Sequence, residues 1–310
     1  MAINITSGFK YRPQRVVIYG PEGIGKTTLA SKFDDPVFID TENGSGHLDV
    51  KRIDLPKNWV TLLETVKEVS MTGGLCKTLV LDTADWAESL CIESVCKKYN
   101  QPSIEAFGYG KGYVYVMEEW QRLLKALDAV IDSGVTVVIT AHAKMRKFEQ
   151  PDALGAYDRW EMKLSRQVAP LLKEWCDCLL FLNYKTTVIT DASGKAKAQG
   201  GKRWIYATHN PCWDAKNRLG LPDDMELTDD LTDVLFKSIQ KTTDAKPFPL
   251  WDLMQRDKIT QDEIEAMCYA KHFCEEGTKL PDFSDELKKF LVDGWENVIK
   301  LVTADRNLPF

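Results

Sequence analysis

Short apolar runs alternate with longer amphipathic stretches along the first 175 residues. Apolar runs of strand length occur at residues 15–19, 36–39, 78–81 and 135–140. In the stretches between them, apolar residues recur every three or four positions, which is the spacing of one helix face. The clearest helical stretches are residues 59–69, 84–99 and 114–131. Strands that alternate with helices predict an α/β fold with a mainly parallel sheet.

The pattern changes after residue 175. Residues 178–184 and 203–208 are rich in β-forming residues, and the polar segment between them contains glycine. This arrangement predicts a β-hairpin that adds antiparallel strands to the sheet.

A polar stretch at residues 241–249 separates the hairpin from a region with helical periodicity. Lysine, threonine, aspartate and proline in this stretch are typical of a loop between structured segments. We therefore predict a core at residues 1–240 and a small helical carboxyl-terminal region at residues 241–310.

Composition narrows the class of protein. With 310 residues, 44 % of them hydrophobic and 28 % charged, the chain can bury one large core. No stretch approaches the roughly 18 apolar residues of a membrane span, so no membrane partner is expected. The eight cysteines form no CxxC pair, which favours reduced thiols and a cytoplasmic location. The net charge of −6 means that any nucleic-acid site must be a local basic patch.

A phosphate-binding loop follows the first predicted strand. Residues 20–27 read GPEGIGKT and match GxxxxGK[ST], with a helix predicted from about Lys26. Glycines allow backbone N–H groups to surround phosphates, Lys26 adds a positive charge and Thr27 offers a Mg2+ ligand. An accidental glycine-rich turn would not require these flanks, so we predict that the chain binds ATP and Mg2+. The predicted nucleotide-binding residues are Gly20, Pro21, Glu22, Gly23, Ile24, Gly25, Lys26, Thr27 and Thr28.

Polar residues at the ends of three other strands are candidates for the same site. Asp82 ends an apolar run and could hold Mg2+ beside Thr27, although an aspartate there also commonly caps the next helix. Glu42 follows the second strand and could activate a water as general base, or it could be a solvated loop residue. His142 could sense the γ-phosphate or could simply be hydrogen-bonded locally.

The nucleotide motifs resemble the paired signature of RecA-type recombinases. That signature is formed here by GPEGIGKTT at residues 20–28 and FIDTE at residues 38–42. The resemblance implies that Glu42 is the catalytic base. Residues 138–142, VITAH, lie where RecA-like proteins place a polar sensor that is usually glutamine, so His142 is a departure from the family pattern.

The chain more specifically resembles phage RecA-like ATPases, usually labelled AAA-family or nucleotide-binding proteins. The resemblance covers roughly residues 1–240, and implies a RecA-like P-loop NTPase core. It also implies a role in phage recombination and single-strand annealing, in the cytoplasm of a bacterial host. The segments that carry it are SIEAFGYGKGY at residues 103–113, KRW at 202–204 and DAKNRLGLP at 214–222.

Two segments, residues 108–113 and residues 144–166, occupy the positions of the RecA-type DNA-binding loops. Both combine cations with aromatic side chains, which suits phosphate contacts and base stacking along single-stranded DNA. A solvated loop and helix face is the alternative interpretation, because the second segment also carries acidic residues. The predicted DNA-binding residues are Tyr109, Lys111, Tyr113, Lys144, Arg146, Lys147, Phe148, Arg159, Trp160, Lys163 and Arg166.

Lys216 and Arg218 resemble the Lys-x-Arg element that hexameric helicases of the RecA fold insert into a neighbouring subunit's nucleotide. Cations supplied there would neutralise charge on the transferring phosphoryl group. The resemblance implies composite sites between copies of the chain in a ring or filament. Ordinary surface cations are the alternative.

These observations predict an ATPase, stimulated by DNA, whose assembly holds single-stranded DNA during recombination or annealing. Expected partners are single-stranded DNA, further copies of the chain and a single-strand-binding protein. The expected catalytic residues are Lys26, Glu42, Asp82, His142, Lys216 and Arg218. Three alternatives stay open: a P-loop kinase for a small molecule, a non-catalytic scaffold stabilised by nucleotide, and a translocating motor.

Overall fold

A computed structural model of the protein describes residues 12–149, 155–190, 196–228, 249–275 and 277–306. Contacts within the chain divide it into two compact units. The described residues from 12 to 228 belong to the larger unit, and those from 249 to 306 belong to the smaller one.

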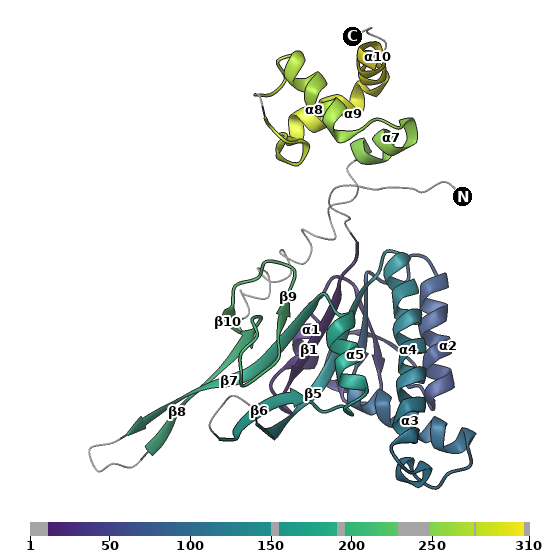
Figure 1. Ribbon diagram of the computed structural model, residues 1–310, viewed down its shortest axis with the longest axis vertical. Helices are drawn as coiled ribbons and strands as arrows, with labels where there is room; N and C mark the ends of the chain where they lie inside the picture. Colours follow the sequence, from purple (N-terminus) through teal and green to yellow (C-terminus); the bar gives the residue numbers. More distant parts are fainter. Residues whose placement is uncertain (1–11, 150–154, 191–195, 229–248, 276, 307–310) are drawn as a thin grey trace. The chain divides into compact units, whose positions relative to one another are not determined.

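A mixed β-sheet forms the centre of the larger unit (Figure 1). Its strands are β1 (Arg15–Gly20), β2 (Pro36–Asp40), β3 (Lys51–Ile53), β4 (Thr78–Asp82), β5 (Thr136–Phe148), β6 (Tyr157–Met162), β7 (Cys178–Thr190), β8 (Ala196–Tyr206), β9 (Lys216–Asn217) and β10 (Asp224–Glu226). In the described part of the chain their order is β10-β8-β7-β1-β5-β4-β2-β3, with β6 paired to β5 and β9 to β7.

The strands nearest the phosphate-binding loop are parallel. β1 lies between β5 and β7 and runs parallel to both, and β2, β3 and β4 continue the parallel part. β7 and β8 form the predicted antiparallel hairpin, and β10 pairs antiparallel with β8. The predicted α/β fold, with a mainly parallel sheet and an added antiparallel hairpin, is confirmed.

Helices cover both faces of the sheet. They are α1 (Lys26–Ala30), α2 (Trp59–Met71), α3 (Ala84–Lys98), α4 (Lys111–Asp132) and α5 (Val168–Trp175). Because side chains alternate across a strand, Val17 and Tyr19 of β1 pack into the core with α2 to α5. Val16 and Ile18 pack on the opposite face with Leu29 of α1. Both faces are therefore buried, as a parallel sheet requires.

β5 is longer than the sequence predicts. The expected strand ends at residue 140, whereas β5 continues to Phe148 and its last six residues pair antiparallel with β6. Residues 144–147 are all exposed, so no apolar alternation marks this part of the strand. The segment predicted as a DNA-binding loop, residues 144–166, is consequently a two-stranded ribbon over residues 144–148 and 157–162.

The smaller unit is helical, as predicted. Its helices are α7 (Pro249–Asp257), α8 (Gln261–Ala270), α9 (Asp285–Asp293) and α10 (Trp295–Arg306). They surround a core of their own that includes Met254, Ile264 and Trp295. A capping box between Thr260 and Glu263 begins α8 by satisfying backbone N–H groups at the helix end. Within the described residues of both units, no helix has the length and apolar character needed to cross a membrane.

The close packing of β1 against β7 generates a stability prediction. A Cβ atom added to Gly20 would lie inside van der Waals contact of the Leu182 carbonyl oxygen. We expect Gly20→Ala to lower the free energy of unfolding by roughly 1–3 kcal/mol, measured by chemical denaturation. Gly73→Ala is the control, since a Cβ there meets nothing within 4 Å. Equal stability of the two variants would contradict the packing described.

Candidate functional site

The phosphate-binding loop turns from the end of β1 into α1. Gly23 and Gly25 have φ angles of 70° and 105°, a backbone region in which other residues are strained. The turn surrounds Lys26, which is buried and whose Nζ donates to the carbonyl oxygens of Gly20 at 3.2 Å and Pro21 at 3.0 Å. Burial lowers the pKa of Lys26, while nearby carboxylates act against this shift. A buried cation enclosed by a glycine turn fits a bound phosphate group.

Asp82 lies beside this loop at the end of β4. Its carboxylate accepts hydrogen bonds from the hydroxyl groups of Thr27 and Thr140. Burial raises the pKa of Asp82, and the two hydroxyl groups act in the opposite direction. The side chain does not cap the next helix, since Thr83 is the N-cap residue of α3. Carboxylate and hydroxyl oxygens are ligands that Mg2+ prefers, so Thr27 and Asp82 fit the predicted metal.

Hydrogen bonds at the end of β2 fix the position of Glu42. The Asp40 carboxylate accepts from the backbone N–H groups of Glu42 at 3.2 Å and Ser45 at 2.8 Å. The Thr41 hydroxyl donates to the Thr83 carbonyl and accepts from the Thr83 N–H, both at 2.9 Å. These bonds join the end of β2 to the end of β4 and bring Glu42 close to Asp82. Glu42 thus lies at the same edge of the sheet as Asp82, with its side chain 36 % exposed.

The carboxylates of this site differ in pKa because their hydrogen bonding differs. Burial acts to raise the pKa of Asp40, but hydrogen bonds from Ser45 and its neighbours outweigh it and lower the pKa. Burial also raises the pKa of Glu42, and the nearby His142 only partly opposes this. Within the described residues, no hydrogen-bond donor contacts the Glu42 carboxylate. Glu42 is thus the more basic of the two carboxylates.

His142 connects Glu42 to an aspartate that the sequence did not indicate. The Asp85 carboxylate accepts the His142 backbone N–H at 3.0 Å and lies 2.9 Å from Nδ1 of the ring. Since an ionised carboxylate can only accept, Nδ1 carries the proton. The other ring nitrogen, Nε2, lies 3.9 Å from Oε2 of Glu42. Asp85 therefore orients His142 so that its second nitrogen faces the candidate base.

The sequence does not mark Asp85 as a site residue, because acidic residues are common in the first turn of a helix. Burial acts to raise its pKa, but the hydrogen bonds from His142 outweigh it and lower the pKa. The signal available in the sequence was only its position, three residues after Asp82 and on the first turn of α3.

Comparison with known proteins identifies a family that the chain matches. The family model described as AAA domain matches residues 12–219, which is more than half of the chain. The chain belongs to the AAA domain family. Its larger unit is accordingly a nucleotide-binding domain of the P-loop ATPase type.

Among solved structures, the AAA domain is similar to a KaiC-like protein from the hyperthermophilic archaeon Pyrococcus horikoshii. The two share 17 % sequence identity with a TM-score of 0.35, over 62 % of this chain and 78 % of that one. A search of curated proteins found no match.

The elements that carry the predicted DNA-binding residues, the start of α4 and the ribbon of β5 and β6, lie toward the carboxyl ends of the parallel strands (Figure 1). Near the start of α4, Tyr109 is fully exposed and Lys111 is exposed. Tyr113 instead donates its hydroxyl group to Glu105 at 2.8 Å. In the second segment, the exposed members are Lys144, Arg146, Lys147, Lys163 and Arg166.

Two residues of the second segment are not placed as predicted. Arg159 is buried and forms an ion pair with Asp214. Trp160 is partly buried, and its ring centroid lies 6.1 Å from that of Phe181 in the core. Their polar and aromatic groups are used inside the fold, so they cannot line a DNA groove in this conformation. Phe148 remains half-buried, with Tyr157 against its ring at 5.6 Å.

Lys216 also differs from its predicted role. Its Nζ donates to the carbonyl oxygens of Lys173, Glu174 and Cys176, at 3.1, 3.0 and 2.5 Å. These carbonyls lie at the carboxyl end of α5, where a lysine satisfies backbone acceptors and the helix dipole. The ammonium group thus stabilises its own chain and is not free for a neighbour.

Arg218 is 61 % exposed and lies 3.4 Å from Asp177. Asp177 donates its backbone N–H to Arg15, the first residue of β1. Gly20 is at the other end of this strand, roughly 16 Å away at about 3.3 Å per residue. Arg218 is therefore too distant to act on the nucleotide of its own chain.

The Asp85–His142 contact predicts which ring nitrogen of His142 carries the proton. At alkaline pH, a two-bond 1H–15N correlation spectrum of the wild type should show the Nδ1-protonated form. Asp85→Ala should shift the ring to the Nε2-protonated form, because the acceptor for Nδ1–H is removed. The chain has only four histidines, and His142→Gln identifies the signal. An Nε2-protonated ring in the wild type would show that Asp85 does not orient His142.

Proposed function

We propose that this protein is a Mg2+-dependent ATPase that assembles into a ring or filament on single-stranded DNA. The proposed role is phage DNA recombination or annealing. The observation that carries the proposal is the convergence of Lys26, Asp82 and the Glu42–His142 pair at one edge of the sheet. Exposed cations of the two predicted DNA-binding segments, among them Lys111 and Lys144, lie at the same edge.

Each side chain of the site has a distinct part in the proposed hydrolysis. Lys26 and the backbone N–H groups of the loop bind the phosphates and neutralise their charge. Glu42, whose pKa is raised by burial, accepts a proton from the attacking water. The water oxygen bonds to the γ-phosphorus, and the bond from that phosphorus to the β-γ bridging oxygen breaks, which releases ADP. Mg2+ held by Thr27 and Asp82 would neutralise charge on the phosphate oxygens.

His142 supports a link between the nucleotide and the DNA. Its Nε2 faces Glu42, and its backbone carbonyl accepts the N–H of Lys163 at 2.7 Å. Lys163 is exposed, and its Nζ lies 3.9 Å from Glu22 of the phosphate-binding loop. If ATP binding moves Glu42 or His142, the backbone hydrogen bond between His142 and Lys163 would therefore transmit that movement to Lys163, a cation of the proposed DNA surface.

The proposed assembly uses Arg218 as the cation supplied to a neighbour. Its exposure and its distance from the nucleotide of its own chain both support a role in trans. Lys216 has a structural role in the proposal, since its ammonium group is already bound by three carbonyls.

Glu42→Gln is expected to lower ATP hydrolysis at least 100-fold while leaving ATP affinity within about threefold. The amide keeps the shape of the side chain but is a very weak base. Release of phosphate should be measured with and without single-stranded DNA at fixed moderate salt, together with ATP binding by calorimetry.

Wild-type turnover should rise on addition of single-stranded DNA. A rate of ATP hydrolysis that does not change when DNA is added, or phosphate transfer to a small acceptor, would contradict the proposal and favour a P-loop kinase. ATP binding without any turnover would favour a nucleotide-stabilised scaffold.

The exposed cations at the carboxyl edge predict the salt dependence of DNA binding. Lys111→Ala/Lys147→Ala removes one cation from each proposed DNA segment. If both contact phosphates, the slope of log affinity against log salt should become less steep by roughly 1.4, at about 0.7 per phosphate contact on a single strand. Fluorescence anisotropy with a labelled oligonucleotide measures the slope.

Lys67→Ala/Lys125→Ala is the matched control for this experiment. It removes the same charge from exposed positions of α2 and α4 that lie further along these helices. The control should leave the slope unchanged. Equal slopes for the two double variants would mean that DNA binding is non-specific attraction or lies elsewhere.

A further inference from the structure

Arg52 of β3 directs its side chain back to the segment that follows Glu42. Its Nε donates to the hydroxyl group of Ser45 at 2.7 Å. Its terminal nitrogens donate to the carbonyl oxygens of Val50 at 3.1 Å, of Leu48 at 2.5 Å and of Ser45. Within the described residues, no carboxylate forms an ion pair with this guanidinium group. Arg52 therefore uses its fixed set of donors to hold the backbone in place.

Hydrogen bonds connect Arg52 to the backbone of Glu42. Ser45 is fully buried, and its hydroxyl group donates its only proton to Asp40 at 2.5 Å. The same hydroxyl oxygen accepts the Nε–H of Arg52. The Asp40 carboxylate in turn accepts the backbone N–H groups of Glu42 and Gly44, both at 3.2 Å. Arg52 is thus one end of a network whose other end is the candidate base.

The turn at residues 42–44 depends on this network. All three residues are exposed, and none has an apolar side chain that could be buried. The backbone passes through the left-handed region at Asn43, with a φ of 60°, where residues other than glycine are uncommon. Hydrogen bonds to Thr83 anchor the residue before the turn, and the contact between Ser45 and Arg52 anchors the residue after it. Without that second anchor, the turn is held at its first end and by Asp40 alone.

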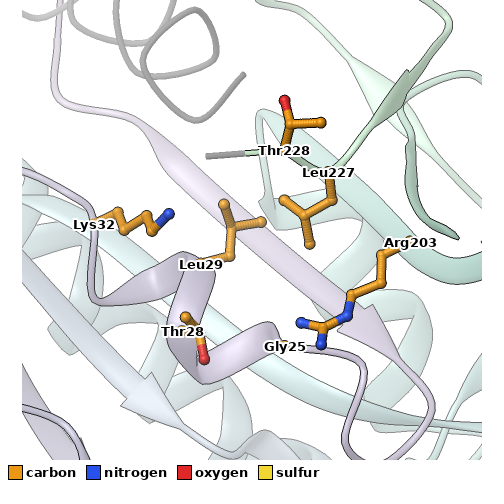
Figure 2. A pocket seen from close by; sticks show the side chains of 7 residues that line it. All are labelled: Gly25, Thr28, Leu29, Lys32, Arg203, Leu227 and Thr228. Atoms are coloured by element: carbon orange, nitrogen blue, oxygen red, sulfur yellow. The ribbon is translucent and has the colours of Figure 1, made fainter. Parts of the chain in front are cut away.

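We infer that Arg52 is a positioning residue for ATP hydrolysis, because through Ser45 and Asp40 it holds the turn that carries the Glu42 carboxylate. The inference rests on the role of Glu42 in the proposed function and adds the contacts that keep this base in place. The hydrogen bonds of Arg52 lead to residues 45–50, whereas the cleft beside the phosphate-binding loop is lined by residues of α1 and β8 and by their neighbours (Figure 2). Arg52 therefore acts on the rate of hydrolysis and not on nucleotide affinity.

Single-turnover hydrolysis of ATP with Mg2+ and without DNA tests the inference. Arg52→Ala should lower the rate constant roughly 10- to 100-fold, because a displacement of about 1 Å at a catalytic group can cost about 100-fold. Affinity for ADP, measured by calorimetry, should stay within about threefold of the wild type. Arg52→Lys should lower the rate constant by a smaller factor, since it keeps the charge but not the two-pronged geometry.

The effect of Glu42→Gln on these variants separates positioning from a general structural role. If Arg52 acts through Glu42, adding Arg52→Ala to Glu42→Gln should lower the rate constant by less than about threefold. A variant that merely damages the fold would lower the rate constant by the same factor with and without Glu42→Gln. Thermal unfolding of each variant detects misfolding, and if Arg52→Ala misfolds the same comparison is made with Arg52→Lys.

Lys51→Ala is the matched control, because it removes the same charge from the adjacent position of β3. Lys51 pairs with Asp35 at 2.6 Å, and its side chain is 64 % exposed, so the rate constant should stay within about twofold of the wild type. Amide hydrogen exchange of residues 41–48, with ADP bound, gives a readout that does not need hydrolysis. Arg52→Ala should accelerate this exchange roughly tenfold, and Lys51→Ala should leave it unchanged.

Three results would overturn the inference. These are equal rate constants for Arg52→Ala and Lys51→Ala, an equal loss from Arg52→Ala with and without Glu42→Gln, and equal hydrogen exchange of residues 41–48 in Arg52→Ala and Lys51→Ala. A wild-type rate of hydrolysis that does not change when DNA is added would contradict the proposed function alone. A wild-type protein that binds ADP but hydrolyses no ATP would contradict the proposed function, and hydrogen exchange would then decide whether Arg52 holds the turn.

Discussion

The site depends on the register of the parallel strands. Pairing of β1 with β5 sets Gly20 opposite His142, and pairing of β2 with β4 sets Asp40 opposite Asp82. Because neighbouring parallel strands all point the same way, these residues meet at one edge of the sheet. A shift of one residue in either pair would turn the side chains to the other face and separate them. The close contact of Gly20 with β7 fixes the same edge from its other side.

Burial of several carboxylates at one edge of the sheet costs free energy. Hydrogen bonds offset this cost for some of these carboxylates and not for others. Asp40 and Asp85 receive hydrogen bonds that lower their pKa values, so they remain ionised and hold the backbone and His142 in place. Glu42 receives none from the described residues, and burial raises its pKa. The result is a division between carboxylates that maintain the geometry and one that is suited to accept a proton.

The sequence was sufficient for the parts of the fold that follow local rules. The P-loop, the four apolar strands and the hairpin follow from glycine positions and from the spacing of apolar residues. β3 and the outer half of β5 were missed because Lys51 and residues 144–147 are exposed, and all of them except Met145 are charged. These segments pair through backbone hydrogen bonds, which leave no apolar alternation to detect.

The parts of the site that were missed depend on tertiary contacts. Asp85 matters because β5 brings His142 beside the first turn of α3, and Arg52 matters because β3 places its guanidinium group beside Ser45. The roles predicted for Arg159 and Trp160 rested on residue type and on the position of a RecA-type loop, and the role of Lys216 rested on a resemblance. Only the structure reveals that Asp214, the aromatic core and the end of α5 already occupy their side chains.

The central claim is that the strand ends converge on one terminal phosphate. The measurement that tests it most directly is a crystal structure with Mg2+ and a non-hydrolysable ATP analogue. The account predicts a γ-phosphate beside Lys26, with Glu42 and His142 facing it and Mg2+ beside Thr27 and Asp82. A terminal phosphate bound away from Lys26, or a Glu42 side chain turned into solvent in that complex, would contradict it.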